Sequence, residues 1–404
     1  MNTREHMELL SGDPPTFAAR TVLSMLARIE RGRIEVGLPD RSRLTFGSGT
    51  PAARIDIAEW SVFAAVLARG DIGFAEAYLD GRWTTPDLPG LLTVTALNRT
   101  TIDRAIYGGF PGRLVCRILQ ALNANTRRGS RRNIAAHYDL GNDFYGLWLD
   151  PSMTYSSALF GGDSACSLES GQAAKYRRIL ERLAPAAGNS ILEVGCGWGG
   201  FAELAARDYG CRVTGLTLSR EQLRYAEERM RRAGVAGLAK FDFRDYRDER
   251  GSYDFVVSIE MIEAVGERYW PDFFAMIARS LKRGGRAIVQ AITIADELFD
   301  RYRKGADFIR QYVFPGGMLP SPSRFRAEAQ AAGLALADAL AFGQDYAETL
   351  RHWRRSFGER RRELRSLGYD ERFARLWDFY LAYCEAGFAT ACTDVHQFDL
   401  LRPR

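Results

Sequence analysis

Histidine and cysteine are scarce in this chain of 404 residues, which contains four histidines and six cysteines. The histidines stand apart and the cysteines form no C-x-x-C pair, so we expect neither a metal site nor a disulfide framework. Reduced cysteines suit the cytoplasm. The N-terminal segment MNTREHMELLSGDPP lacks the apolar core of a signal peptide, and we therefore expect no export.

Long apolar runs and lysines are also missing. No stretch of about 18 uncharged apolar residues occurs, so no segment is expected to cross a membrane. The net charge of +5 comes almost entirely from arginine, because Lys175, Lys240, Lys282 and Lys304 are the only lysines. This mild basic excess is compatible with an anionic lipid surface or with nucleic acid and does not distinguish them. The length is sufficient for two domains.

The most informative stretch is ILEVGCGWGG at residues 191–200, which FAELAARDY follows at helical spacing. Glycine lets the backbone approach a ligand closely, so a strand, a glycine turn and a helix start predict a cofactor cradle. The third glycine, Gly199, falls one position too early for the dinucleotide-binding pattern, and Gly200 follows it as a side-by-side repeat. The form E-x-G-x-G-x-G, with Glu193, Gly195 and Gly197, resembles motif I of class I S-adenosylmethionine-dependent methyltransferases. An NAD site and a merely structural turn are the alternatives.

Strand-like and helical segments alternate after the glycine motif. The strand-like segments are 211–219, 239–246, 253–266 and 284–294. This alternation predicts an α/β fold of the Rossmann-like class I methyltransferase type, with a mostly parallel sheet and helices on both faces. Ligands should gather at the carboxyl ends of the strands. Ser219 is a candidate helix N-cap, with Gln222 at the third helical position.

The sequence pattern is different in the part of the chain that precedes the glycine motif. Alternating residues at 33–40, 43–47 and 53–60, then helical spacing at 60–83, predict a small α+β domain, which we assign to residues 1–124. The basic segment 125–133 is the expected linker, as a solvated hinge or as a membrane-surface contact.

The second domain is assigned to residues 125–404. Its aromatic-rich stretch at 133–165 suggests a lid over the cofactor rather than a core helix. Residues 295–322, which contain a Pro-Gly-Gly turn, depart from the alternation as an inserted substrate cap would. The remaining expected elements are helices at 169–183, 323–332 and 345–392 and a last strand at 395–401.

From His137 to about residue 400, the chain resembles the cyclopropane-fatty-acyl-phospholipid synthase family, which includes the mycolic acid cyclopropane synthases. The segments that carry the resemblance are HYDLGNDFY, LDPSMTYSSA, LEVGCGWGG, LTLSREQ, FRDYRD, EAVG, FPGGMLPS and FGQDYAETL. The N-terminal GDIGFAEAYLDG is similar to the phospholipid-acting branch. The resemblance implies methyl transfer from S-adenosylmethionine to a cis double bond of an unsaturated membrane phospholipid, with no nucleic-acid partner.

Carried over position by position, the resemblance also implies a cofactor site. The expected cofactor-binding residues are Tyr138, Tyr155, Ser156, Glu193, Gly195, Gly197, Thr217, Leu218, Gln222, Asp245 and Tyr246. Tyr138 and Ser156 would hold the methionine part, residues 217–222 would lie along the ribose, and Asp245 with Tyr246 would lie near the adenine. For Tyr138 and Tyr246, simple core packing is the alternative.

The chemistry that the resemblance implies makes definite demands on the site. An alkene is a poor nucleophile, so the methyl donor must be held in line with it, and positioning alone supplies about 7–11 kcal/mol. The carbocation left on the lipid is stabilised by aromatic faces, each by about 2 kcal/mol when desolvated. Water must be excluded, and a base must finally remove a proton.

In the family that base is a bound bicarbonate, held by a Cys, a Glu, a His, a backbone group and a Tyr. The matching positions here are Ser157, Glu263, Gln290, Ile292 and Tyr346. The serine and the glutamine still donate hydrogen bonds. Glutamine cannot carry the positive charge of a histidine, so bicarbonate should bind more weakly.

An additional carboxylate, Glu260, lies three residues before Glu263. Two neighbouring carboxylates raise each other's pKa, which predicts a direct protein base at this strand end. Pairing of Glu260 with an arginine is the alternative.

These departures leave the product open between a cyclopropane ring, the family default, and a methylene- or methyl-branched chain. The other interpretations are a methyltransferase for a small diffusible substrate and a non-enzymatic lipid-binding partner subunit. A leaflet's hydrocarbon is about 15 Å deep, so the enzyme must draw the acyl chain into an apolar tunnel. We expect residues 295–322 to form its wall and the N-terminal domain to dock lipid. We therefore expect a cytoplasmic protein with transient peripheral contact to the inner membrane face, and the resemblance suggests a homodimer.

Overall fold

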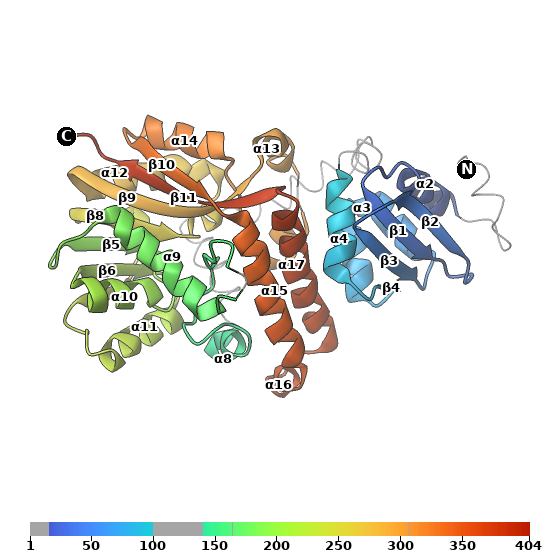
Figure 1. Cartoon of the computed structure of the whole chain (residues 1–404), viewed down its shortest axis with the longest axis horizontal. Coiled ribbons are helices and arrows are strands. Elements are labelled where there is room, and N and C mark those ends of the chain that lie inside the picture. Colours follow the sequence, from blue (N-terminus) through green and yellow to red (C-terminus); the bar gives the residue numbers. More distant parts are fainter. Residues whose placement is uncertain (1–15, 100–139, 164, 306) are drawn as a thin grey trace.

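The computed structural model describes residues 16–99, 140–163, 165–305 and 307–404, and it shows two domains side by side (Figure 1). Tyr138 and the expected linker at 125–133 lie outside the described residues. None of the helices within these ranges is long and apolar enough to span a bilayer.

The N-terminal domain is a small sheet covered by helices. Its strands are β1 (Gly32–Gly37), β2 (Arg43–Ser48), β3 (Ala52–Ile57) and β4 (Trp83–Thr84), in the order β2-β1-β3-β4. Its helices are α2 (Phe17–Leu26), α3 (Ser61–Leu79) and α4 (Leu88–Leu97). Inward-facing residues alternate with exposed ones along β1 and β3, as the sequence pattern predicted. The helical spacing at 60–83 corresponds to α3, which is interrupted at Gly70.

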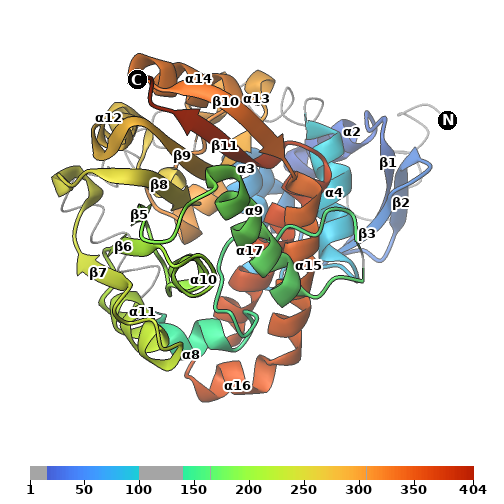
Figure 2. The same ribbon diagram turned by 60° about the vertical axis from the view of Figure 1, so that its left-hand side comes forward.

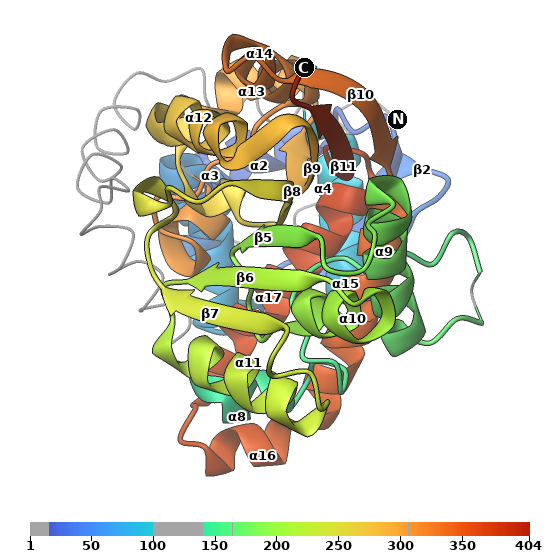
Figure 3. The ribbon, with the colours of Figure 1, turned by 90° about the vertical axis from the view of Figure 1, so that its left-hand side faces the viewer.

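The second domain contains a seven-stranded sheet of order β10-β11-β9-β8-β5-β6-β7. The strands are β5 (Ser190–Val194), β6 (Arg212–Thr217), β7 (Ala239–Phe243), β8 (Tyr253–Ile259), β9 (Leu281–Ile294), β10 (Ala335–Ala341) and β11 (Thr393–Leu401). The strands from β9 to β7 run parallel, while β11 is antiparallel to both β9 and β10. Figure 3 shows β8, β5, β6 and β7 one below the other. The class I methyltransferase fold is confirmed.

Helices cover both faces of this sheet, as the alternation predicted (Figure 2). They are α8 (Gly141–Gly146), α9 (Leu168–Leu183), α10 (Gly200–Tyr209), α11 (Arg220–Arg232), α12 (Trp270–Ser280), α13 (Asp296–Tyr302) and α14 (Pro322–Ala331). Ile191 packs with residues of α9, α10 and α11. Its neighbour Leu192 packs with α12 and α14 instead. Because successive side chains of a strand point to opposite faces, these two residues belong to two separate cores.

The expected helical region at 345–392 consists of α15 (Gly343–Glu359), α16 (Arg361–Ser366) and α17 (Glu371–Ala389). The last helix lies against α4 of the N-terminal domain (Figure 1). Polar contacts accompany this packing: the hydroxyl of Tyr78 donates to Asp378 at 3.3 Å, and Arg375 donates to the Tyr78 carbonyl at 3.0 Å. The two domains therefore share one interface, and α17 packs in the same buried core as the N-terminal domain.

Two expectations require correction. The edge strand β10 was not predicted, because its sequence ALADALA is rich in alanine, which is depleted in strands. The aromatic stretch at 133–165 was expected to be a lid rather than core. Instead Phe144, Tyr145 and Trp148 are buried, and Phe144 packs edge-on against Trp377 of α17 with ring centroids 4.9 Å apart.

The contact between α14 and β11 carries a stability prediction. Phe325 is fully buried and stacks on Phe398 with ring centroids 3.8 Å apart. Phe325→Ala should lower the free energy of unfolding by about 3–5 kcal/mol, measured by urea denaturation. As a control, Phe17→Ala, at a side chain that is 75% exposed, should change it by less than about 0.5 kcal/mol. Equal changes in the free energy of unfolding for the two variants would contradict the burial of Phe325 against Phe398.

Candidate active site

The glycine turn forms the floor of the candidate cofactor site. Gly195 has φ 83° and Gly197 has φ 52°. A Cβ atom on Gly195 would lie 2.8 Å from the Cγ of Met261, whereas one on Gly197 would meet no atom within 4 Å. Gly195 is thus required by packing, and Gly197 leaves open space in front of the turn. This open space at the start of α10 fits the close approach of an adenosyl cofactor to the backbone.

Glu193 lies at the end of β5 next to this turn and is buried. Its Oε2 has no hydrogen-bond partner within the described residues. Burial raises the pKa of Glu193 well above its usual value, and the charge of Arg229 offsets this only in part. A buried acceptor without a partner fits a donor on a bound ligand.

The end of β6 provides a second part of the cradle. The Thr217 hydroxyl donates to Gln222 Oε1 at 2.9 Å and accepts from the Ser219 backbone N–H at 3.1 Å. Ser219 caps α11 by accepting from the Gln222 N–H, as predicted. Leu218, half-buried, lies between these anchored residues. The loop 217–222 is therefore fixed by its own hydrogen bonds.

Asp245 and Tyr246, expected near the adenine, follow β7. The Asp245 carboxylate forms an ion pair with Arg247 at 2.6 Å. The ring of Tyr246 packs edge-on against Phe273 with centroids 5.8 Å apart, and its buried hydroxyl has no partner within the described residues. Tyr246 therefore contributes to the core, the alternative stated for it, while its hydroxyl retains an unused hydrogen bond.

Tyr155 and Ser156 lie on the segment before α9. Tyr155 shares a hydrogen bond of 2.7 Å with the hydroxyl of Tyr380. The Ser156 hydroxyl accepts a 2.5 Å hydrogen bond from Nζ of Lys175, and its carbonyl accepts from Gln172 at 2.8 Å. Lys175 is fully buried, and burial lowers its pKa to about 7.

Lys175 and Gln172 were missed by the sequence analysis. The signal that would have identified Lys175 is its position on the buried face of a helix, beside Tyr176 and Ile179. Both side chains hold the segment that carries Ser156 and Ser157, so they position residues of the site.

The Glu260 carboxylate lies at the centre of the strand-end cluster, directly after β8. Its Oε1 accepts from the Ser157 backbone N–H at 2.9 Å and from Gln290 Nε2 at 2.7 Å. Its Oε2 accepts from the Tyr346 hydroxyl at 2.6 Å. Glu260 also has φ 50°, a left-handed conformation that costs a non-glycine residue about 1–3 kcal/mol and recurs at functional sites. Burial raises its pKa, while the charge of Lys175 and these hydrogen bonds lower it.

Glu263 stands next to this carboxylate. Its Oε1 accepts from the Ile292 N–H at 2.5 Å, and its Oε2 is buried without a partner within the described residues. Burial, and secondly the neighbouring Glu260 carboxylate, raises the pKa of Glu263 to about 8. The elevation expected from two neighbouring carboxylates is therefore found at Glu263, whereas burial is what raises the pKa of Glu260. Within the described part of the chain, the Glu260 carboxylate bonds to Ser157, Gln290 and Tyr346 rather than to an arginine, which was the alternative.

This arrangement differs from the bicarbonate site that the resemblance implied. Three of the expected ligand positions, Ser157, Gln290 and Tyr346, donate to Glu260, and the fourth donor, Ile292, donates to Glu263. The Ser157 hydroxyl donates to the Ala158 carbonyl. The donors are thus engaged by the protein's own carboxylates, and the residues in this arrangement do not fit a bound bicarbonate.

Both glutamates line a large cavity of about 1160 Å³. The wall near them includes Tyr155, Tyr346 and Tyr380, together with Ile292 and Phe314. The segment 295–322 supplies further wall residues, among them Tyr302, Met318 and Leu319. The cavity therefore brings a carboxylate pair, aromatic rings and aliphatic side chains into one enclosure, which can surround an apolar chain.

Comparisons with known proteins agree with this geometry. The family model described as mycolic acid cyclopropane synthetase matches residues 125–398. Tuberculostearic acid methyltransferase UfaA1 of Mycobacterium tuberculosis is 40% identical over 376 residues, which cover 89% of this chain and 87% of that protein. The cyclopropane-fatty-acyl-phospholipid synthase of Escherichia coli K12 is 34% identical over 343 residues, covering 84% and 86%. The crystal structure of mycolic acid cyclopropane synthase CmaA1 with SAH and CTAB has 30% identity and a TM-score of 0.63, covering 67% of this chain and 98% of that one.

The raised pKa of Glu263 predicts a pH-dependent stability. Between its usual value of 4.5 and about 8, the folded protein holds a proton that the unfolded chain releases. The contribution of Glu263 to stability therefore falls as pH rises, by up to about 1.4 kcal/mol per pH unit. Glu263→Gln should gain stability relative to the parent as pH rises through this window, measured by urea unfolding. The same change at the exposed Glu221 is the control, and parallel curves for Glu263→Gln and the parent would contradict the prediction.

Proposed function

The chain belongs to the mycolic acid cyclopropane synthetase family, and we propose that it transfers a methyl group to the double bond of unsaturated phospholipid acyl chains. Membership in this family makes it an S-adenosylmethionine-dependent lipid methyltransferase. The acyl double bond, the phospholipid and the product are the proposal. The observation that carries it is the aromatic-lined cavity that contains Glu260 and Glu263.

Bound S-adenosylmethionine supplies an electrophilic methyl group. We assign its binding to the glycine turn, Glu193, the loop 217–222 and the segment that carries Tyr155 and Ser156. Asp245, Tyr246 and Tyr138 complete the proposed set. The alternative of a small diffusible substrate is disfavoured because the carboxylates line a large cavity walled mainly by apolar side chains.

The cavity wall suits the cation that alkene methylation leaves on the lipid. The π electrons of the alkene form the new carbon–carbon bond, and the positive charge remains on the neighbouring carbon. Tyr155, Tyr346 and Tyr380 line this part of the cavity, and aromatic faces attract a desolvated cation. The apolar wall also excludes the water that would trap the cation as an alcohol.

The carboxylate pair takes the role that a bound anion has in the family. We assign to Glu260 the place of the anion, because the donors expected for bicarbonate converge on it. Glu263 has an oxygen without a partner and a pKa of about 8, close to that of an efficient general base. We treat them as one coupled base that takes the proton from the methylated lipid. An intact base disfavours the reading as a non-catalytic subunit.

The same contacts favour a branched product over a ring. Burial raises the pKa of Glu260, but three hydrogen bonds to its carboxylate oppose this rise and make it a weaker base than a buried carboxylate without partners. When proton removal is slow, a hydride has time to shift from the methylated carbon to the cationic carbon, which moves the positive charge to the methylated carbon. The base then takes a proton from the new methyl group. The product then keeps a double bond as a methylene branch. The relative that is a tuberculostearic acid methyltransferase supports this choice, and the cyclopropane ring remains the second candidate because of the Escherichia coli relative.

The location of the enzyme in the cell and its oligomeric state also belong to the proposed function. We propose that it acts in the cytoplasm, contacts the inner membrane face transiently, and forms a homodimer. The apolar cavity supports the membrane contact, since an acyl chain must leave the bilayer to reach the carboxylates.

Analysis of the reaction product tests the proposed methylation directly. The protein should be incubated with S-adenosylmethionine and vesicles of unsaturated phospholipid, and the acyl chains analysed as methyl esters before and after catalytic hydrogenation. We expect a gain of one CH₂ and a double bond that takes up hydrogen. A gain of one CH₂ without hydrogen uptake would identify the ring instead. No gain in mass would contradict methylation of the acyl chain.

The place assigned to Glu260 predicts a chemical rescue. Glu260→Gly removes the carboxylate, suits the positive φ, and frees the N–H of Ser157, the Gln290 amide and the Tyr346 hydroxyl. Methyl transfer should fall by about 10²–10⁴-fold, the usual loss for a general base, and bicarbonate or formate should restore part of it.

The matched control is Glu260→Gln, whose amide fills the space without supplying a base. Glu260→Gln should transfer methyl groups as slowly as Glu260→Gly, and neither bicarbonate nor formate should raise its rate. If Glu260→Gly kept full activity, or if both variants responded alike, Glu260 would not occupy the anion's place.

A further inference from the structure

The cavity does not end at the carboxylates but continues into the interior of the N-terminal domain. Its lining there consists of Val22, Met25, Leu26, Ile34, Val36, Ile55, Ile57, Val62, Phe63, Leu91 and Leu92. On β1 and β3 these are the inward-facing residues of the sheet. The side chains that form the core of a small domain therefore also surround an open space.

An open space of this kind is unfavourable unless something fills it. Protein interiors are close-packed, and an unfilled cavity destabilises by about 24 cal/mol per Å³. The whole cavity of about 1160 Å³ also exceeds the roughly 300–1,000 Å³ of ordinary small-molecule sites. The lining of the N-terminal part is aliphatic and aromatic, so its occupant is an apolar chain rather than water.

Charged residues line the region where α3 of the N-terminal domain meets the segment 300–310 of the second domain. Besides Glu260 and Glu263, the charged lining residues are the cations Arg69, Arg99, Arg301, Lys304 and Arg310 and the carboxylates Asp71, Asp300 and Asp307. Arg69 is paired with Glu76, so the other four cations face three carboxylates and leave an excess of one positive charge. We call these eight residues the charged waist.

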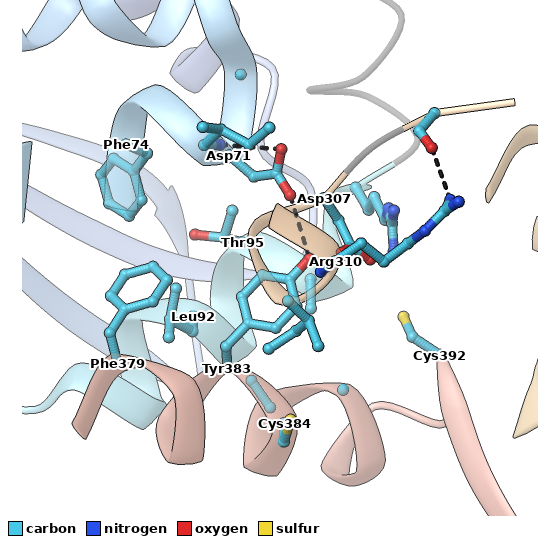
Figure 4. A pocket seen from close by; sticks show the side chains of 18 of the residues that line it. Asp71, Phe74, Leu92, Thr95, Asp307, Arg310, Phe379, Tyr383, Cys384 and Cys392 are labelled. Carbon is cyan, nitrogen blue, oxygen red and sulfur yellow. Dashed lines mark hydrogen bonds between the residues drawn. The ribbon is translucent and has the colours of Figure 1, made fainter. Parts of the chain in front are cut away.

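The charged waist is formed by α3, by α13 with the residues that follow it, and by Arg99 after α4. Helix α3 is broken at Gly70, which has φ 59° and ψ −132°, and Arg69 and Asp71 flank this break. Asp71 accepts from Tyr383 of α17 at 3.3 Å. Figure 4 shows this hydrogen bond between Asp71 and Tyr383 beside Asp307 and Arg310, with Phe74 and Phe379 on one side and Cys392 on the other. The π-helical segment Ile309–Val313, which begins beside Asp307, also bonds to α3, since the Tyr312 hydroxyl donates to Glu76.

We propose that the hollow of the N-terminal domain takes the second acyl chain of a diacyl phospholipid whose phosphate lies at the charged waist. The first chain then extends past the waist to Glu260 and Glu263. This inference rests on the proposed function and makes it specific: the preferred substrate is a whole two-chain anionic lipid, not a fatty acid or a single-chain ester. The N-terminal domain binds lipid in its interior rather than on its surface.

The test measures binding separately from methylation. Val66 lines the hollow on α3, and Ala64 on the same helix is exposed and does not line it. The probes are 1-palmitoyl-2-oleoyl-phosphatidylglycerol and 1-oleoyl-lysophosphatidylglycerol, which share the oleoyl chain and the headgroup. Binding is measured by native mass spectrometry and methylation by transfer of the labelled methyl group.

Val66→Trp should weaken binding of the two-chain lipid at least about tenfold, since the loss of two buried CH₂ groups is sufficient for that. Binding of the one-chain lipid should stay within about twofold, and Ala64→Trp should change neither. Unchanged S-adenosylmethionine binding by Val66→Trp shows that the variant is folded. Equal loss for both lipids, or no loss for either, would overturn the proposal.

The charged waist is tested with Lys304→Gln. Both phosphatidylglycerol probes should bind more weakly to this variant, whereas dioleoylglycerol, which lacks the phosphate, should bind as before. Inorganic phosphate is the other source of the same anion, and it should displace the two-chain lipid only in large excess. If Lys304→Gln bound dioleoylglycerol as weakly as the phosphatidylglycerol probes, the phosphate would not lie at the charged waist. Displacement of the two-chain lipid by phosphate at a concentration equal to that of the lipid would contradict the assignment as well. Lipid that binds as expected but is never methylated would contradict the proposed function and leave this inference intact.

Discussion

The site depends on one buried carboxylate. Glu260 receives the Ser157 N–H, the Gln290 amide and the Tyr346 hydroxyl, so three segments far apart in the sequence meet at a single side chain. Its backbone has φ 50°, and this unfavourable conformation persists because the surrounding donors hold the carboxylate. Its charge helps to raise the pKa of Glu263, and in the mechanism we propose the pair is the base beside the apolar cavity.

The cavity explains why two domains are joined through α17. An acyl chain needs an enclosure longer than one small core provides, and the space between and within the domains supplies it. The lining combines aliphatic side chains of the N-terminal domain, the charged waist and aromatic rings. In the binding mode we propose, each part matches a different portion of a phospholipid, so lipid recognition and the exclusion of water arise from the same enclosure.

Much of the fold could be predicted from the sequence, because apolar periodicity and the glycine turn are local signals. The strand β10 could not, since its alanines carry no strand preference. The carboxylate pair was predicted by its spacing, but the direction of the Glu260 side chain depends on a left-handed backbone conformation that residue types do not show. Lys175 was missed because its partners, Ser156 and Gln172, meet only in the folded chain. The hollow N-terminal core was also missed, because alternating Ile and Val residues predict the same pattern whether the core is filled or open.

The central claim is that the protein's own carboxylates replace an exogenous anion. The most direct measurement is the initial rate of methyl transfer by the unmodified enzyme in buffer purged of carbon dioxide and then supplied with bicarbonate. Because the donors are already engaged by Glu260 and Glu263, the rate should be the same under both conditions. A rate that collapses after purging and recovers with bicarbonate would contradict the account.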